Sequence, residues 1–112
     1  MEEQIQSQST PESNSEVTKS IVVFGKHDYI VNNAQILLEK GNYTVVGFVE
    51  LEMASMYLVA NPFDMLFLVG SVDPHDRLAL KAIVDKDFPN AKILDHFGGP
   101  ATILTEVNEA FK

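Results

Sequence analysis

Cysteine is absent from this 112-residue chain, and its absence excludes several kinds of chemistry. Without thiols the chain has no disulfide bond, no thiolate metal site and no cysteine nucleophile. Long apolar runs are also absent, since none approaches the roughly 20 residues that a membrane-spanning helix needs. The first residues lack a basic region followed by an apolar one, so they do not predict a secretory signal peptide. We therefore expect a soluble cytoplasmic protein.

Positive charge is scarce: the chain has 8 Lys and Arg residues against 16 Asp and Glu residues, and its formal net charge is −8. Nucleic-acid phosphates and anionic membrane surfaces would repel such a chain, so we expect neither as its main partner. Hydrophobic residues make up 46% of the sequence, which is enough for a core, and the length suits one domain.

Residues 1–18 differ in composition from the rest of the chain. They are rich in Glu, Gln, Ser and Thr, and their main apolar residues besides Met1 are Ile5 and Val17. Such a segment buries too little apolar surface to offset the entropy lost on ordering. We expect residues 1–18 to be a disordered tail, either a solubilising leader or an arm that binds a partner, and residues 19–112 to form the folded domain.

Residues 65–69, Met-Leu-Phe-Leu-Val, are apolar without interruption and are followed by glycine. A strand that is apolar on both faces belongs in the middle of a sheet that is covered on both sides. Three further strands are predicted at residues 20–24, 43–49 and 91–94, and a helical pattern follows each of the four strands. This alternation predicts an α/β fold, a doubly wound three-layer sandwich with four parallel strands. The expected strand order is 2-1-3-4, and 3-2-1-4 is the alternative.

Residue types at the helix ends support these boundaries. Asp28 is the expected N-cap of the first helix, and Gly41 occupies the position of a C′ glycine. Ser71 or Asp73 is expected to cap the third helix, with Pro74 in its first turn. The residues expected to face the core are Leu51, Ala54 and Leu58 in the second helix and Leu78, Ala82 and Ile83 in the third.

Three segments, residues 21–25, 37–47 and 61–68, resemble the corresponding parts of response-regulator receiver domains in their spacing and apolar pattern. The third segment, Asn-Pro-Phe-Asp-Met-Leu-Phe-Leu, is similar to the approach to the strand that carries the phosphorylated aspartate in that family. The resemblance covers residues 20–97. It implies a flavodoxin-like fold and a role in signal transduction through protein–protein interaction.

The residues that perform the receiver family's chemistry are replaced here. The paired acids that hold magnesium match Gly25 and Lys26, the nearest acid is Asp28, and the phosphoacceptor aspartate matches Val69. The Ser or Thr switch position falls within residues 95–97, which contain neither, and the family's fifth strand with its lysine has no counterpart. The resemblance therefore implies a degenerate, truncated receiver-like domain that cannot be phosphorylated.

Histidines next to aspartates follow three of the predicted strands. Because the carboxyl ends of neighbouring parallel strands lie about 4.8 Å apart, these side chains are expected to approach one another at one edge of the sheet. Three imidazoles with carboxylates suit zinc or another divalent transition metal. The alternative is that they are ordinary loop and capping residues whose side chains point apart. The candidate metal ligands are His27, His75, His96, Asp28 and Asp95.

Two adjacent glycines, Gly98 and Gly99, precede the last predicted helix, which begins with Pro100. Glycines at a helix N-terminus allow backbone N–H groups to approach an anionic ligand, and Thr102 is close enough in sequence to contribute its hydroxyl. The alternative is a tight strand-to-helix turn with no ligand. Neither a phosphate-binding loop motif nor a dinucleotide fingerprint is present.

Catalysis has little support, because no Gly-x-Ser-x-Gly motif is present and the acids near the strand ends are better explained as helix caps. We expect a non-enzymatic, receiver-like interaction module that binds protein. It is also expected to form a homodimer through the strand at residues 91–94 or the last helix, since an open sheet edge tends to be paired. The alternative is a domain that binds a small ligand or a metal at the carboxyl edge, where converging histidines would be the distinguishing feature.

Overall fold

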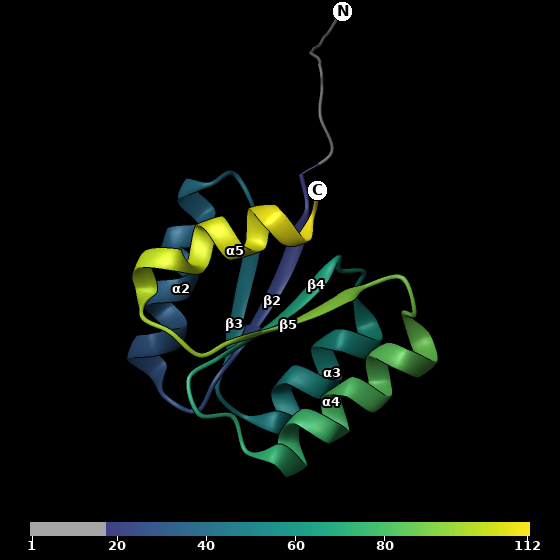
Figure 1. Cartoon of the computed structure of the whole chain (residues 1–112). Coiled ribbons are helices and arrows are strands. Elements are labelled where there is room, and N and C mark those ends of the chain that lie inside the picture. Colours follow the sequence, from purple (N-terminus) through teal and green to yellow (C-terminus); the bar gives the residue numbers. More distant parts are fainter. Residues whose placement is uncertain (1–17) are drawn as a thin grey trace, which may run out of the picture.

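The computed structural model describes residues 18–112, so the predicted tail lies outside the described residues except for Thr18. Strands and helices alternate along the described chain (Figure 1). They are β2 (Ser20–Phe24), α2 (Asp28–Lys40), β3 (Thr44–Phe48), α3 (Leu51–Ala60), β4 (Met65–Val69), α4 (Pro74–Asp87), β5 (Lys92–His96), the 3₁₀ helix η2 (Pro100–Thr102) and α5 (Ile103–Ala110).

All four strands are parallel and lie in the order β3-β2-β4-β5. This is the predicted order 2-1-3-4, and the alternative order was wrong. At the centre of the sheet, Val22 pairs with Val46 on one side and with Leu66 on the other. The chain turns in opposite directions from the two central strands, β2 and β4, so a crevice is expected at their carboxyl ends.

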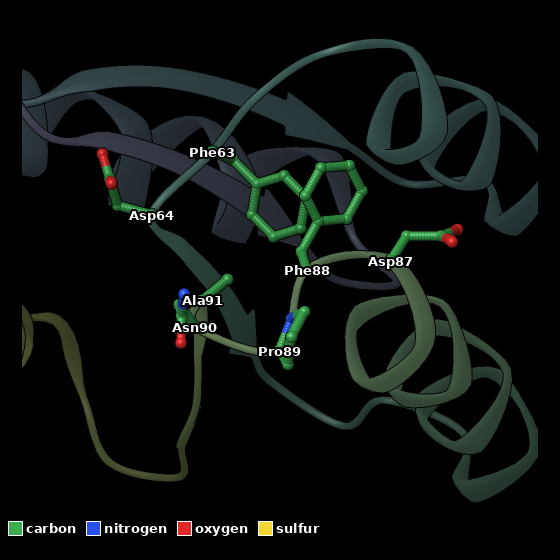
Figure 2. Close-up of a pocket in the computed structure, with 7 residues that line it drawn as sticks. All are labelled: Phe63, Asp64, Asp87, Phe88, Pro89, Asn90 and Ala91. Carbon is green, nitrogen blue, oxygen red and sulfur yellow. The ribbon is translucent and has the colours of Figure 1, made fainter.

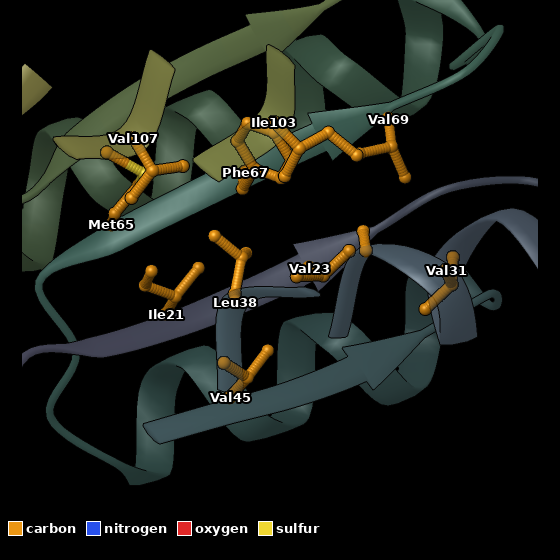
Figure 3. Close-up of a cluster of buried hydrophobic side chains, with 11 residues drawn as sticks. Ile21, Val23, Val31, Leu38, Val45, Met65, Phe67, Val69, Ile103 and Val107 are labelled. Carbon is orange, nitrogen blue, oxygen red and sulfur yellow. The ribbon is translucent and has the colours of Figure 1, made fainter. Parts of the chain in front are cut away.

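Helices cover both faces of the sheet, with α2 and α5 on one face and α3 and α4 on the other (Figure 1). Successive strand residues alternate between the two faces, so β4 contributes Phe67 to the α2/α5 core and Leu66 to the α3/α4 core. Figure 3 shows the α2/α5 core, in which Leu38 of α2 lies near Ile21, and Ile103 and Val107 of α5 lie beside Phe67 and Met65 of the sheet. The central strand β4 is buried along its whole length, as its uninterrupted apolar sequence predicts.

Two features of the helix ends differ from expectation. The residue with positive φ after α2 is Asn42, at 71°, whereas Gly41 has a φ of −89°. Asparagine tolerates the left-handed conformation. A Cβ at Gly41 would contact the end of the Leu104 side chain of α5, which would have to shift to make room. Asp28 is the first residue of α2, and its N-cap is His27, which makes no side-chain capping bond.

Helix α4 is rotated relative to the prediction. Its N-cap is Asp73, whose carboxylate accepts a hydrogen bond from the His75 N–H at 2.8 Å, and Pro74 follows as predicted. The residues that it buries are Leu80 and Val84. Of the predicted core residues, Ile83 does pack against the core, whereas Leu78 and Ala82 are exposed. Both sets have helical spacing, and in the observed orientation the first turn of α4 places Asp76 and Arg77 in the ion pairs described below.

Candidate functional site at the carboxyl edge

A pocket of about 280 Å³ lies at the carboxyl edge of the sheet, where ligands bind in open α/β folds. Its walls come from the first turns of α2, from the end of β4 and from the loop that joins β5 to α5. Most of the wall is apolar side chain, and the polar groups are few. The lining residues are Tyr29, Ile30, Asn33, Val69, Gly70, His96, Gly98, Gly99, Pro100 and Ile103.

His96 is the buried polar residue of this pocket, with an exposed fraction of 3%. Its Nε2 lies 2.8 Å from the Gly99 carbonyl oxygen, and its Nδ1 lies 2.9 Å from Glu106 Oε1. The ring therefore lies between two acceptors, with a carbonyl oxygen at one nitrogen and a carboxylate oxygen at the other. These bonds tie the loop after β5 to helix α5.

Glu106 completes this arrangement from the first turns of α5. Its second carboxylate oxygen, Oε2, accepts a hydrogen bond from the Thr102 hydroxyl at 2.8 Å. The hydrogen bonds from His96 and from Thr102 lower the pKa of Glu106 below its ordinary value, because both stabilise the ionised carboxylate. The Thr102 hydroxyl is therefore engaged with Glu106, and Thr102 is not among the residues that line the pocket.

Of the predicted ligand-binding residues, Gly98 and Gly99 do line the pocket. A Cβ added at Gly99 would meet no atom within 4 Å, and one added at Gly98 would make only ordinary contacts, the nearest with His96 Cε1 at 3.8 Å. Packing therefore does not require glycine at either position. The missing side chains leave the wall formed by this loop open.

The predicted histidine cluster does not form in the described structure. His27 is exposed beside Tyr29, with a ring-centroid distance of 5.8 Å, and His75 is exposed with its Nδ1 3.5 Å from Asp76 Oδ1. Among residues 18–112, no group of three His, Asp or Glu side chains is placed to hold a metal ion. Strand β5 extends to His96, and strand alternation places this buried imidazole against Glu106 of α5, whereas His27 and His75 are exposed.

The predicted carboxylate ligands are also placed elsewhere. Asp28 is exposed at the start of α2, and Asp95 forms a bidentate ion pair with Arg77, with distances of 2.9 Å to Nε and 2.6 Å to Nη2. The hydrogen bond and the charge of Asp95 raise the pKa of Arg77. A second ion pair joins Lys26 and Asp76 across the same edge at 3.6 Å. The charged groups here thus neutralise one another.

The two positions that the receiver resemblance assigns to magnesium binding and phosphorylation lie against each other. A Cβ added at Gly25 would lie 2.8 Å from the Val69 carbonyl oxygen and 2.9 Å from Val69 Cγ2. This spacing is tighter than real Cβ contacts, so the end of β2 packs directly on the end of β4. Neither residue carries a group that binds magnesium or accepts a phosphoryl group.

A second pocket, of about 250 Å³, lies at the opposite, amino edge of the sheet (Figure 2). The rings of Phe63 and Phe88 meet there with centroids 4.8 Å apart. The Asp64 carboxylate accepts a hydrogen bond from the Ser20 N–H at 2.7 Å, so it fixes the start of β2. The residues that line this second pocket hold the loops at the amino ends of the strands in place, and they do not form a set of catalytic groups.

One surface was missed by the sequence analysis: the outer face of α3. The exposed fractions of Met53, Met56 and Val59 are 51%, 61% and 58%, and these residues are three apart in sequence, so they form one stripe. The inner side of α3 buries Ala54 and Leu58. The sequence signal was the near absence of polar residues from α3. A helix on the surface of a sheet needs an apolar side only toward the core, so apolar residues on its outer side are unexpected.

Comparison with known proteins identifies a similar fold but no family. No family model matches the chain, and no curated protein matches it. Among solved structures, the chain is similar to a de novo designed Rossmann fold protein, with a TM-score of 0.55 and 16% sequence identity. The match covers 83% of this chain and 97% of the designed chain.

These features define a class of protein: a Rossmann-like α/β fold with a parallel four-stranded sheet. The predicted fold class is confirmed. The narrower receiver resemblance has no supporting family match. In the described residues, no helix is long and apolar enough to cross a membrane.

Proposed function

We propose that this chain is a cytoplasmic, receiver-like regulatory module that is neither catalytic nor phosphorylated, and that it binds a partner protein through the outer face of α3. The observation that carries the proposal is the exposed apolar stripe of Met53, Met56 and Val59. Soluble proteins rarely expose contiguous apolar side chains without using them. The neutralised charges at the carboxyl edge support a role that does not depend on catalysis.

The partner that fits this surface is an amphipathic helix whose apolar face is flanked by Lys or Arg. Methionine side chains are unbranched and adaptable, which suits them to contact with another helix. Glu50 and Glu52 lie at the N-terminal end of α3, and the last turn of α3 carries no basic residue. With a net charge of −8, the chain is expected to bind a basic peptide more tightly than an acidic peptide of the same apolar face.

The test uses two synthetic amphipathic helices with the same leucine face, one with lysines and the other with glutamates on its polar face. Each is titrated into the isotopically labelled full-length chain, and NMR shifts are mapped onto the structure. We expect the lysine peptide to shift the methyl signals of Met53, Met56 and Val59, and the glutamate peptide to leave them unchanged. Equal responses to both peptides, or shifts that map to another surface, would refute the proposal.

A matched pair of variants makes this test specific to α3. The double variant Met53→Gln with Met56→Gln keeps unbranched side chains of similar helix propensity but removes the apolar surface. The control is Ile36→Gln on α2, because the exposed fraction of Ile36, 52%, is close to that of Met53. We expect the double variant to lose binding of the lysine peptide and the Ile36 variant to retain it.

A second candidate function is the binding of a small ligand in the carboxyl-edge pocket. The observation that favours it is the pocket itself, which combines apolar walls from Ile30, Val69 and Ile103 with a buried polar residue, His96. A volume of about 280 Å³ lies near the lower limit for ligand sites, so the ligand class is a small ring compound with one polar edge.

Indole is a suitable probe for this candidate because it is flat, largely apolar and carries a single N–H. We expect it to shift the NMR signals of Ile30 and Ile103 methyl groups in the wild-type chain. In Gly99→Val the added Cβ meets no atom within 4 Å, so we expect the fold to be retained while the side chain narrows the pocket. Indole binding should weaken in this variant and persist in Ala101→Val, which alters a residue outside the lining; unchanged binding in Gly99→Val would exclude the pocket.

A further inference from the structure

Within residues 18–112, the backbone groups on the outer edge of β5 have no hydrogen-bond partner, and they lie in a defined register. The Lys92 N–H donates to the Asp64 carbonyl at 3.0 Å, and β5 pairs with β4 through the residues that follow. Residues of a parallel strand direct their backbone groups alternately to its two sides. Lys92, Leu94 and His96 therefore face β4, whereas the N–H and C=O groups of Ile93 and Asp95 face outward.

The other edge of the sheet, β3, is protected in a way that β5 is not. There Thr44 bonds to Lys19 at 3.0 Å, which leaves the backbone of Val45 facing outward. The Gln35 side chain covers this position, since its Nε2 donates to the Val45 carbonyl at 3.4 Å. In the part of the chain that the structure describes, no side chain bonds the backbone of Ile93, and the Asp95 side chain is directed to Arg77.

We propose that a second copy of this chain pairs with β5, antiparallel, about a two-fold axis that passes beside Leu94. In this register Ile93 lies opposite Asp95 of the second copy, and Asp95 lies opposite its Ile93. Both residues direct their N–H and C=O groups outward, so each pair exchanges two backbone hydrogen bonds. The edge is complementary to itself, as a two-fold interface requires, and the two sheets join into one of eight strands.

Side chains on both faces fit the same register. Leu94 of the two copies lie opposite each other, on the face covered by α5. Lys92 lies opposite His96 of the second copy, where the Glu106 carboxylate that bonds His96 supplies an opposite charge. This charge complementarity favours a second copy over an unrelated extended peptide. Phe97, which is 88% exposed directly after β5, comes opposite Ala91 of the second copy and loses exposure there.

The proposal is independent of the proposed function, because β5 and the outer face of α3 are separate surfaces. Its test is amide hydrogen exchange of the full-length chain, measured by NMR at micromolar and near-millimolar concentration, with sedimentation to report the oligomeric state. We expect the Ile93 and Asp95 amides to exchange quickly when dilute and at least about tenfold more slowly when concentrated. The Val45 and Gly47 amides, which face outward from β3, should not change with concentration.

Two variants complete the test. In Ile93→Pro the N–H that is lost faces outward, so no bond to β4 is removed, and an edge strand tolerates proline at such a position. In Lys92→Glu the contact with Glu106 of the second copy becomes repulsive, and Lys40→Glu makes the same charge change on α2. We expect Ile93→Pro to be monomeric, Lys92→Glu to dimerise about tenfold more weakly, and Lys40→Glu to resemble the wild type.

Three outcomes would overturn this dimer. The first is a wild-type chain that stays monomeric at every concentration, which would leave the β5 edge to an extended segment of another protein. The second is a dimer in which the Ile93 and Asp95 amides still exchange quickly, which would place the interface elsewhere. The third is an equal effect of Lys92→Glu and Lys40→Glu, which would mean that only net charge matters.

Discussion

Helices α2 and α3 lie on opposite faces of the same sheet, and they differ in the side chains that they expose to solvent. Helix α2 buries Val31, Ala34 and Leu38 and turns mainly polar and charged residues outward, although Tyr29 and Ile36, two turns apart, are exposed as well. Helix α3 buries Ala54 and Leu58 in the same manner, yet its outer side is apolar as well. Folding requires only one apolar stripe on each helix. The proposed binding surface rests on this second stripe of α3, Met53, Met56 and Val59.

The largest expected effect concerns the inner stripes, where the two helices should behave alike. Leu38 of α2 and Leu58 of α3 are both fully buried. Replacing either by alanine removes buried methyl groups and leaves a cavity, so we expect each variant to lose about 2–5 kcal/mol of unfolding free energy. Urea denaturation followed by circular dichroism measures both. A loss below about 1 kcal/mol at either position would contradict the burial on which the comparison depends.

The next effect concerns Gly25, at the end of β2, where the backbone packs closely against Val69 of β4 and Val31 of α2. In Gly25→Ala the new Cβ would lie 2.8 Å from the Val69 carbonyl and 3.1 Å from Val31 Cγ2, and the backbone oxygen cannot easily move away. We expect a loss of about 1–3 kcal/mol from this overpacking. The matched control is Gly99→Ala, where the Cβ meets no atom. Equal stability of the two variants in urea would show that β2 and β4 are less tightly packed than described.

A smaller effect, dependent on pH, belongs to the α2/α5 side alone, where Glu106 bonds to His96. Because these bonds lower the folded-state pKa of Glu106, its contribution to stability is present above the unfolded pKa of about 4.3 and is lost as the pH falls through the folded value. Glu106→Gln removes this dependence. The effect should stay below about 1 kcal/mol, since the carboxylate is partly exposed and screened.

Urea denaturation of the wild type and of Glu106→Gln, measured between pH 6 and pH 3, checks this prediction, because Glu106 becomes protonated within this range. We expect the difference in unfolding free energy between the two proteins to shrink as the pH is lowered. Lys112 and Glu109 form an exposed pair near the end of α5, so Glu109→Gln is a suitable control for general acid effects. A constant difference across the range would mean that the His96–Glu106 bond does not stabilise the fold.

Much of the fold was predictable because apolar periodicity and chain order specify it. The uninterrupted run in β4 and the regular alternation of strands and helices led to the observed strand order. The orientation of α4 was predicted wrongly because Leu78 with Ala82 and Leu80 with Val84 have the same spacing. Only contacts distant in sequence, such as that between Arg77 and Asp95, distinguish the two, and one sequence does not reveal them.

The candidate site was predictable in its position but not in its chemistry. His96, Gly98 and Gly99 were assigned to the carboxyl edge, and all three line one pocket there. Within residues 18–112 the candidate metal ligands do not form one cluster: β5 ends two residues later than predicted, and strand alternation then decides the face on which His96 lies. The outer stripe of α3 was overlooked because the inner stripe, Leu51, Ala54 and Leu58, already accounted for a helix.

The smallest expected change in stability concerns that outer stripe. There the same substitutions should leave the unfolding free energy nearly unchanged but abolish binding of the lysine peptide. Replacing Met53 and Met56 together by glutamine should alter the unfolding free energy by no more than about 0.5 kcal/mol at each position, because the side chains are exposed and the helix propensities are similar. The Ile36→Gln control on α2 should be equally mild, and urea denaturation compares the two. Only the α3 variant should then lose the lysine peptide. If the α3 double variant instead unfolds as readily as Leu58→Ala, the stripe belongs to the core, and the difference between α2 and α3 no longer points to a binding surface.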